Sequence, residues 1–508
     1  MRLTPVFCAA LGTAAGFYLL ASLAPVISFV FLFVSVVVLC FFYVLASFCG
    51  KAVVPRRYYT DLLFDGRLRE SRLLQLTAVC STAFSVGLIL GICAASSGRR
   101  EASFAIMPEK VTAVEGALLE DPRIISSGRA ISVLSLQRCA GEGGLRASSK
   151  GEITVFFPQE SAERLKSLGR GAEVFAEGSL RLTETGWTFS ANSLHITKPA
   201  PAIERMRTGI RLSLISRFNK DKNLSGLSDG GGLALALLLG IRDNLDTNLA
   251  AMYRNAGCSY ILALSGMHLA VLAAILAFLL KKPLGLKTAS ITGAVIIILY
   301  CFIVGPMPSL NRAALMYLLG VIAILGALPK EPLSILSLSF LIQIVISPSA
   351  GYSISFILSY LALAGIFIIG KPLHSLFAGK APDFILQPLS ASCGAFLATA
   401  GVTGFSFGII VPMGIITGLV LVPLTTVFMV GSLVWLVLDF LSLSSLLSFP
   451  LLLLYRAMEG IVYAVGKIGG IPAGNPFVIL VLSLVISLLV VILEYKQRRA
   501  RLKLQAFH

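Results

Sequence analysis

Charged residues are scarce in this sequence, and their scarcity excludes an ordinary soluble protein. Only 13% of the 508 residues are Asp, Glu, Lys or Arg, whereas a soluble globular domain carries about a quarter. Hydrophobic residues make up 56% of the chain, above the usual share of about 45–50%. Because lipid-facing side chains require no contact with water, this balance is typical of a chain that crosses a membrane many times.

Motifs of common hydrolases and metalloenzymes are absent as well. No GxxxxGK[ST] loop occurs, which excludes nucleotide hydrolysis by a P-loop. No HExxH occurs among only 4 histidines and no CxxC among 9 cysteines, so the sequence predicts neither a metal site nor a cofactor. Ser265 and His268 stand three residues apart, but GxSxG and an acidic partner are missing. We therefore expect a protein that is not an enzyme.

The chain does contain many apolar segments long enough to cross a bilayer. We expect two spans within residues 6–48, one at 73–95 and nine more after residue 257, about twelve in all. The last nine are predicted at 258–280, 287–305, 310–328, 332–347, 352–370, 384–402, 408–430, 431–448 and 476–494.

The distribution of lysine and arginine predicts the orientation in a cytoplasmic membrane. The net charge of +17 fits either nucleic-acid binding or the usual excess of basic residues in cytoplasmic loops. Basic residues at 51–72, around 281–287 and at 496–503 then fall on one side, so both termini are expected to be cytoplasmic. Counting residues 451–468 as a span would move the basic tail outside, so we predict an amphipathic helix on the outer surface there.

A more polar segment from residue 99 to about 205 interrupts the apolar pattern. Short turns rich in Gly, Pro and Ser separate five runs of period-two alternation, which favours a small extracytoplasmic barrel or sandwich. An OB-like barrel, a fold that often holds single-stranded nucleic acid, is one option. The charges of the acidic and basic residues in this segment nearly cancel, so the sequence pattern alone favours a β domain without a binding role. The predicted strands are 111–119, 130–136, 152–157, 173–182 and 187–196.

Short helical pieces precede a polar notch in the membrane core. Gly231–Gly240 is apolar but too short to span, and Leu245–Gly257 is amphipathic, with Asp246 as its predicted N-cap and Gly257 as its C-cap. The polar stretch Ser259–His268 follows inside a predicted span. Membrane proteins use such broken helices to line aqueous cavities.

Several polar side chains in this core have two explanations each. His268 is predicted about ten residues into its span, roughly 15 Å deep, where it faces water or hydrogen-bonds between helices. Arg312 opens another span, with Ser309 as a possible N-cap, and a cation there opposes the helix macrodipole. It either snorkels to the outer interface or faces a pore and meets anions, and Arg242 and Arg254 have the same two explanations.

Four stretches of the core occur in a characteristic order. They are Leu237–Asp243, Ala256–Leu269, Pro308–Met316, and Pro348 with Ser355–Tyr360. Together they resemble the ComEC family of competence proteins, the channels that take up DNA during natural transformation. Ile241, Tyr260 and Ile357 depart from the family pattern. Many members continue into a metallo-β-lactamase-like domain that is thought to degrade the strand that is not transported. The sequence up to His508 does not contain it, so we expect a separate nuclease to degrade that strand.

The resemblance implies a channel that carries single-stranded DNA inward, with membrane lipid around it. A phosphate anion in hydrocarbon costs tens of kcal/mol, so such a path needs cations. Arg242 and Arg312 are implied to contact phosphates, with Ser265, Gly266 and His268 shaping a constriction. The further candidates for the path are Arg254 and Ser309.

The implied OB-like domain would stack bases on Phe175, Trp187 or Phe189, although core packing is the alternative for each. Implied partners are an extracytoplasmic DNA receptor and, because the chain has no motor motif, a cytoplasmic helicase-like ATPase. Two other functions stay open: transport of another anionic solute or envelope precursor, and a membrane-embedded serine hydrolase using Ser265 and His268.

The sequence therefore predicts a polytopic α-helical membrane protein with an inserted OB-like β domain. Its expected regions are a three-helix membrane region (1–98), the β domain (99–205), short amphipathic or re-entrant helices (206–257), a competence-type transmembrane core (258–450), an outer amphipathic helix (451–475), and a last span with a basic tail (476–508).

Overall fold

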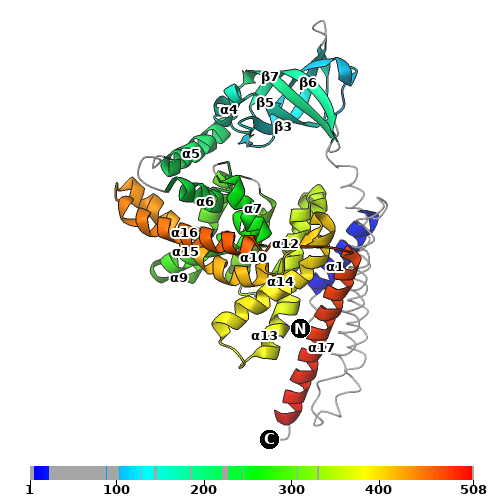
Figure 1. Cartoon of the computed structure of the whole chain (residues 1–508), viewed down its shortest axis with the longest axis vertical. Helices are drawn as coiled ribbons and strands as arrows, with labels where there is room; N and C mark the ends of the chain where they lie inside the picture. Colours follow the sequence, from blue (N-terminus) through cyan, green and yellow to red (C-terminus); the bar gives the residue numbers. More distant parts are fainter. Residues whose placement is uncertain are drawn as a thin grey trace.

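The protein consists of a β domain above a helical body, as Figure 1 shows. The computed structural model describes residues 5–21, 87, 102–125, 127–141, 146–183, 186–219, 227–243, 245–305, 307–328 and 331–505. Of the first three predicted spans, only α1 (Pro5–Ala21) and Gly87 are described. The rest of those spans and the basic loop at 51–72 lie outside the described residues.

The β domain is a closed barrel. Its strands follow the order β1–β6–β7–β5–β3, and β3 pairs again with β1 to close the ring. β5 and β7 run parallel, whereas the other neighbours are antiparallel. The helix α4 (Gln159–Lys166) lies between β5 and β6. The strands are β1 (Val111–Leu118), β2 (Arg123–Ile124), β3 (Ala130–Gly141), β4 (Arg146–Ser148), β5 (Glu152–Phe157), β6 (Glu173–Thr183) and β7 (Gly186–Lys198).

All five predicted strands are confirmed, and their alternation explains the barrel core. Side chains in strands point alternately to opposite faces. Val114, Leu134 and Val155 therefore point inward from three strands, and each has 0% of its surface exposed. The prediction of a small β domain is thus correct for these five strands, whereas the two short strands β2 and β4 were not predicted.

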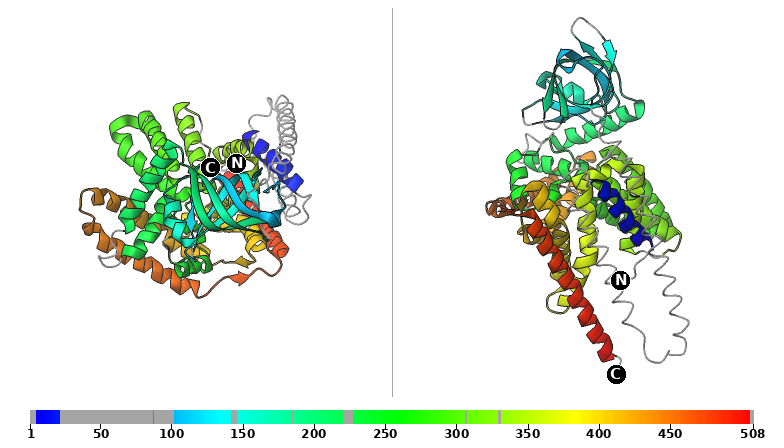
Figure 2. Two further views of the ribbon diagram at one scale, coloured as in Figure 1. Left: turned by 90° about the horizontal axis from the view of Figure 1, so that it is seen from above. Right: turned by 90° about the vertical axis from the view of Figure 1, so that its right-hand side faces the viewer.

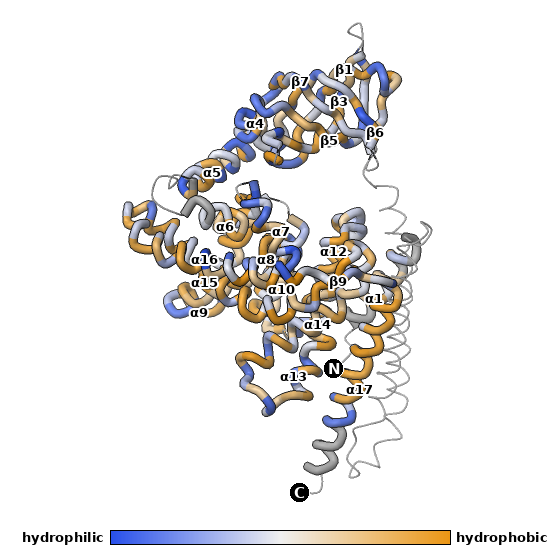
Figure 3. The backbone as a smooth tube through the Cα atoms, in the orientation of Figure 1, coloured by the Kyte–Doolittle hydropathy of each residue, from blue (hydrophilic) through white to orange (hydrophobic). Residues whose placement is uncertain are grey.

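The helical body contains segments long and apolar enough to cross a membrane. Within the described ranges seven helices meet that length and composition, and α11 is shorter, with 15 residues. Figure 3 shows apolar residues spread over these helices. The total of about twelve spans stays a prediction. The helices are α5 (Ala202–Asn219), α6 (Leu227–Leu239), α7 (Thr247–Asn255), α8 (Ser259–Leu262), α9 (Gly266–Val304), α10 (Pro308–Leu325), α11 (Pro332–Ile346), α12 (Ile354–Gly365), α13 (Lys371–Phe377), α14 (Asp383–Phe407), α15 (Gly414–Phe440), α16 (Ser445–Gly466) and α17 (Pro476–Gln505).

Two predicted span boundaries are wrong. The first arm of α9 begins at Gly266 rather than at residue 258, because the backbone leaves the helix after α8. Residues 408–430 and 431–448 are not separate spans, since α15 continues through Gly431 to Phe440. Gly431 is a packing residue: a Cβ there would lie 2.7 Å from Cδ2 of Leu451 in α16. The chain turns later, near Ser442, whose φ is 59°.

The helix α16 runs level across the body, whereas α17 is steep (Figures 1 and 2). Tyr455 and Met458 are buried, and Arg456 pairs with Glu459 at 2.6 Å on a more exposed side. After α16 the chain forms β9 (Ile471–Pro472), which pairs with β8 (Ile409–Ile410). A helix therefore exists near the predicted residues, but it begins at Ser445 and is itself one of the seven helices long and apolar enough to span a membrane. Its predicted place on the outer membrane surface stays a prediction.

The helix α5 connects the barrel to the body through ionic contacts. Arg207, whose side chain is 1% exposed, pairs with Asp121 of the barrel and with Glu204. Burial lowers the pKa of Arg207, but these two carboxylates outweigh burial and raise it. Arg211 also pairs with Asp121, at 3.1 Å, and donates to the carbonyl of Val304 at the end of α9. Asp121 thus lies between the barrel and the membrane helices.

The far end of α5 is fixed to α15. Arg217 pairs with Asp439 at 2.6 Å, and the rings of Phe218 and Trp435 stack with centroids 5.0 Å apart. A further ion pair of 3.3 Å joins Lys166 of α4 to Asp243 after α6. The barrel is therefore docked on the body through several polar contacts.

Replacing Asp121 should weaken this docking. Asp121→Ala leaves two arginines without a shared partner, and we expect a loss of about 1–3 kcal/mol in stability, since Glu204 still pairs with Arg207. The thermal unfolding midpoint of the purified protein measures the loss. The control is Glu109→Gln, an exposed barrel carboxylate that forms no ion pair with any described residue. Equal midpoints for both variants would contradict the docking role.

Candidate nucleic-acid path

The polar notch predicted at 259–268 is a break between α8 and α9. Ala263 and Ser265 have extended backbone, with ψ of 130° and 169°. The imidazole of His268 then caps α9, because the Ser265 N–H donates to Nδ1 at 2.9 Å. His268 is thus the third residue of its helix and lies in the first turn. The predicted depth of ten residues is wrong because the helix starts eight residues later than expected.

The start of α10 packs directly against this break. The Ser309 hydroxyl donates to the carbonyl of Leu264 at 2.5 Å, which satisfies an acceptor that the break leaves free. Met307 occupies the N-cap position, so the predicted capping role of Ser309 is wrong. A Cβ on Gly266 would lie 3.3 Å from Cβ of Ala313, so the two helices approach closely here. The structure therefore brings Ser265, Gly266, His268 and Ser309 together, and Arg312 follows Ser309 in the first turn of α10.

Arg312 is buried in the body, with 4% of its surface exposed. This exposure excludes snorkelling to the interface. Its guanidinium carbon lies 5.4 Å from the ring centroid of Tyr360. Among the described residues no carboxylate pairs with Arg312, and its Nε has no hydrogen-bond partner. The guanidinium thus contacts an aromatic face in place of a counter-charge.

Tyr360 is held by a polar network that sequence reasoning missed. Its hydroxyl donates to Oε1 of Gln343 at 3.0 Å and lies 3.2 Å from Oγ of Ser339. These residues come from α11 and α12, whereas Arg312 comes from α10. Two signals could have found them: Tyr360 ends one of the recognised stretches, and Gln343 is an isolated amide in an apolar span.

His268 has a second, unused nitrogen. Because Nδ1 accepts the Ser265 N–H, the neutral ring carries its proton on Nε2. Nε2 is buried and finds no partner in the described part of the chain. A buried polar group without a partner costs about 1–3 kcal/mol, so it is uncommon in native structures. Among the described residues His268 and Arg312 each have one such atom, as do Tyr253 and Thr425 elsewhere in the helical body.

Ser265 and His268 do not form a hydrolytic triad with any described residue. The Ser265 hydroxyl lies 3.2 Å from Nδ1 of His268, within reach for proton transfer. A triad also needs an acid that orients the second ring nitrogen. No described carboxylate bonds to Nε2, and Nδ1 already caps α9.

Arg242 and Arg254 lie apart from the buried cluster. Both are exposed, Arg242 after α6 and Arg254 in the last turn of α7, where a cation is favourable for the helix macrodipole. The predicted caps of α7 are confirmed: Asp246 accepts from the Asn248 N–H at 3.0 Å, and Gly257 follows the helix with φ of 73°.

The aromatic candidates of the barrel separate into three environments. Phe189 is 0% exposed in the barrel core, so of its two predicted roles the structure supports core packing. Trp187 packs edge-on against Phe104, with centroids 5.9 Å apart. Phe175 is half-buried and lies beside Arg138, Arg146 and the carboxylate of Glu115. Phe175 therefore remains the candidate with cations beside it.

Comparison with known proteins identifies the family. The family model described as "Competence protein" matches residues 237–498. An uncharacterized protein of Aquifex aeolicus is 28% identical over 335 residues, which cover 63% of this chain and 74% of that protein. The "ComE operon protein 3" of Bacillus subtilis is 27% identical over 183 residues, 34% of this chain and 23% of that protein. No solved structure matches the chain.

The family match begins in the last turn of α6 and ends within α17, so it includes the α8–α9 break, Arg312 and Tyr360. It also contains the helices from α9 to α17 that are long and apolar enough to span a membrane. Because the match covers more than half of the 508 residues, this chain belongs to the Competence protein family and is a membrane protein with a role in DNA uptake.

Proposed function

We propose that the protein conducts single-stranded DNA inward across the cytoplasmic membrane, past Arg312. The observation that carries the proposal is a buried guanidinium without a carboxylate partner among the described residues. Charged side chains inside membrane proteins are costly and usually pair with one another or line a path. A DNA strand brings one phosphate per nucleotide and supplies the missing counter-charge.

Tyr360 suits this role because it holds Arg312 without neutralising it. A carboxylate in its place would compete with each arriving phosphate, whereas an aromatic ring leaves the full positive charge available. The unused Nε2 of His268 adds a hydrogen-bond donor in the same helical contact. A donor and a cation together suit the oxygens of a phosphodiester.

The described conformation is closed to a strand. His268 and Arg312 are 2% and 4% exposed, so DNA reaches them only after α9 and α10 separate near their first turns. The contact that must open is formed by Gly266 against Ala313 and by the hydrogen bond from Ser309 to Leu264. Small side chains and one hydrogen bond make this a contact of modest strength.

The barrel is the proposed outer receiving site. Its strand order, with a parallel pair and a helix between β5 and β6, supports an OB-like assignment. Phe175 offers an aromatic face, and Arg138 and Arg146 beside it outnumber the single carboxylate of Glu115, a combination that suits single strands. In this proposal the barrel is extracytoplasmic, both termini are cytoplasmic, and a DNA receptor, a helicase-like ATPase and a separate nuclease assist.

Arg312→Glu should abolish DNA uptake while the protein stays in the membrane. Loss of the phosphate contact and repulsion by a carboxylate cost roughly 3 kcal/mol or more, about a 100-fold drop in transformation. Transformation frequency and membrane immunoblots measure the two effects. The control is Lys380→Glu, an equal charge reversal at an exposed lysine after α13. Normal uptake in Arg312→Glu would remove Arg312 from the path.

Phe175→Ala should weaken binding of single-stranded DNA to the full-length protein. Loss of one stacked base costs about 1–3 kcal/mol, roughly a 5- to 150-fold rise in Kd. Fluorescence anisotropy with a labelled oligonucleotide measures the change. Leu182→Ala, on the same strand and 68% exposed, is the matched control. If both variants bind as the wild type does, the strand contacts another surface.

The contact between Ser265 and His268 favours one second candidate, a serine hydrolase. We expect no such activity, because the described residues offer no acid to orient the histidine. A fluorophosphonate probe should label the wild type and Ser265→Ala equally. Labelling of the wild type that disappears in Ser265→Ala would support the hydrolase and contradict a purely conducting role.

A further inference from the structure

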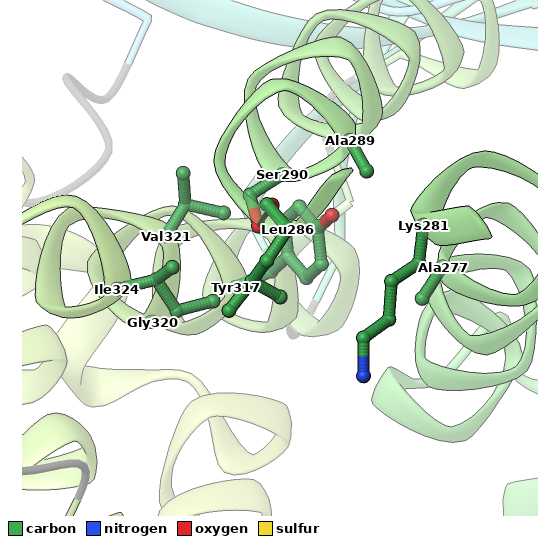
Figure 4. A pocket seen from close by; sticks show the side chains of 9 residues that line it. All are labelled: Ala277, Lys281, Leu286, Ala289, Ser290, Tyr317, Gly320, Val321 and Ile324. Atoms are coloured by element: carbon green, nitrogen blue, oxygen red, sulfur yellow. Dashed lines mark hydrogen bonds between the residues drawn. The ribbon is translucent and has the colours of Figure 1, made fainter. Parts of the chain in front are cut away.

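A cavity of about 250 Å³ lies between the two arms of α9 and the middle of α10. Figure 4 shows Lys281 across this cavity from Gly320 and Ile324. The volume lies slightly below the range of about 300–1,000 Å³ typical of sites for drug-sized ligands. The cavity therefore suits a narrow apolar segment.

The bend in α9 creates this space. Pro283 cannot donate to the helical ladder, and Gly285 has φ of 73°, so the arms diverge after residue 282. Small residues then face the gap: Ala277 from the first arm, Ala289 from the second and Gly320 from α10. A Cβ on Gly320 would meet no atom within 4 Å. The gap is thus unfilled by the protein's own side chains.

The walls and the rim of the cavity differ in chemistry. Leu286, Val321 and Ile324 make the walls apolar, whereas Lys281 contributes its ammonium group at the rim. Lys282 and Lys287 lie on the same exposed turn. None of these three lysines pairs with a carboxylate among the described residues. Three exposed lysines without a carboxylate partner beside an apolar cavity match a ligand with an anionic group and an apolar chain.

The turn lies at the opposite end of the second arm from Val304. Val304, at the other end of the second arm, accepts from Arg211 of α5. The helix from Gly285 to Val304 has a length of about 30 Å at 1.5 Å per residue, which equals the hydrocarbon thickness of a bilayer. Lys281, Lys282 and Lys287 therefore lie about one hydrocarbon thickness along the arm from Val304, a separation that suits contact with lipid headgroups.

We infer that this cavity binds an anionic phospholipid, with one acyl chain between α9 and α10 and its phosphate on the lysines of the turn. Basic pockets between membrane helices recognise anionic headgroups in this manner. The exposed leucines of the turn, Leu284 at 43% and Leu286 at 50%, add apolar contacts for the same lipid. The apolar walls favour a lipid over DNA, which has no chain to place there.

The test compares lipid retention by the full-length protein. Native mass spectrometry after exchange into equal amounts of phosphatidylglycerol and phosphatidylcholine should show preferential retention of phosphatidylglycerol by the wild type. Gly320→Leu places a side chain in the cavity at a position where a Cβ meets no atom within 4 Å. A triple variant, Lys281→Gln, Lys282→Gln and Lys287→Gln, removes the positive charges. Each should lower retained phosphatidylglycerol about tenfold, equivalent to about 1.4 kcal/mol.

The control is Lys380→Gln, which removes an exposed lysine outside the cavity lining and should retain lipid as the wild type does. Unchanged thermal unfolding midpoints show that the variants fold. If either Gly320→Leu or the triple variant fails to fold, the other still tests lipid retention. Equal retention of both lipids by the wild type, or wild-type retention by Gly320→Leu, overturns the inference. So does a triple variant that loses affinity for single-stranded DNA while keeping its lipid.

Discussion

The membrane core depends on the hydrogen bonds that pair backbone groups between α8 and α9, where the helical structure is interrupted. In hydrocarbon an unpaired N–H or C=O is costly, so irregular backbone persists only where other groups bond to it. The Ser265 N–H donates to the His268 imidazole, and the Leu264 carbonyl accepts from the Ser309 hydroxyl. These two bonds tie the break to α9 and α10, and they explain why a histidine and a serine are found in an apolar region.

A second set of polar contacts joins the membrane core to the barrel. Val304 ends α9 and accepts from Arg211, while Arg211 also pairs with Asp121 of the barrel. Only the short connection at 305–307 separates Val304 from α10 and its Arg312. A movement of the barrel that displaces Asp121 therefore acts directly on the segment leading into the helix that carries the buried cation.

The sequence predicted local features well and long-range ones poorly. Alternation located the barrel strands, and Asp246 and Gly257 marked α7, because both signals act over a few residues. The predicted boundary between residues 430 and 431 was wrong, since α15 continues through Gly431, whose close contact is with Leu451 of α16, 20 positions later. The contact of Arg312 with Tyr360 joins residues 48 positions apart, so no local pattern reveals it. The burial of Phe189 depends likewise on which face of its strand turns inward.

The pairing of β8 with β9 gives the body an unusual modular property. Ile410 and Ile471 are adjacent in space, so the chain leaves this point, forms α15 and α16, and returns to it. The helices before and after, α14 and α17, already pack against each other. The helices α15 and α16 thus leave and re-enter the body at one point, so the contact of α14 with α17 does not depend on the path between them.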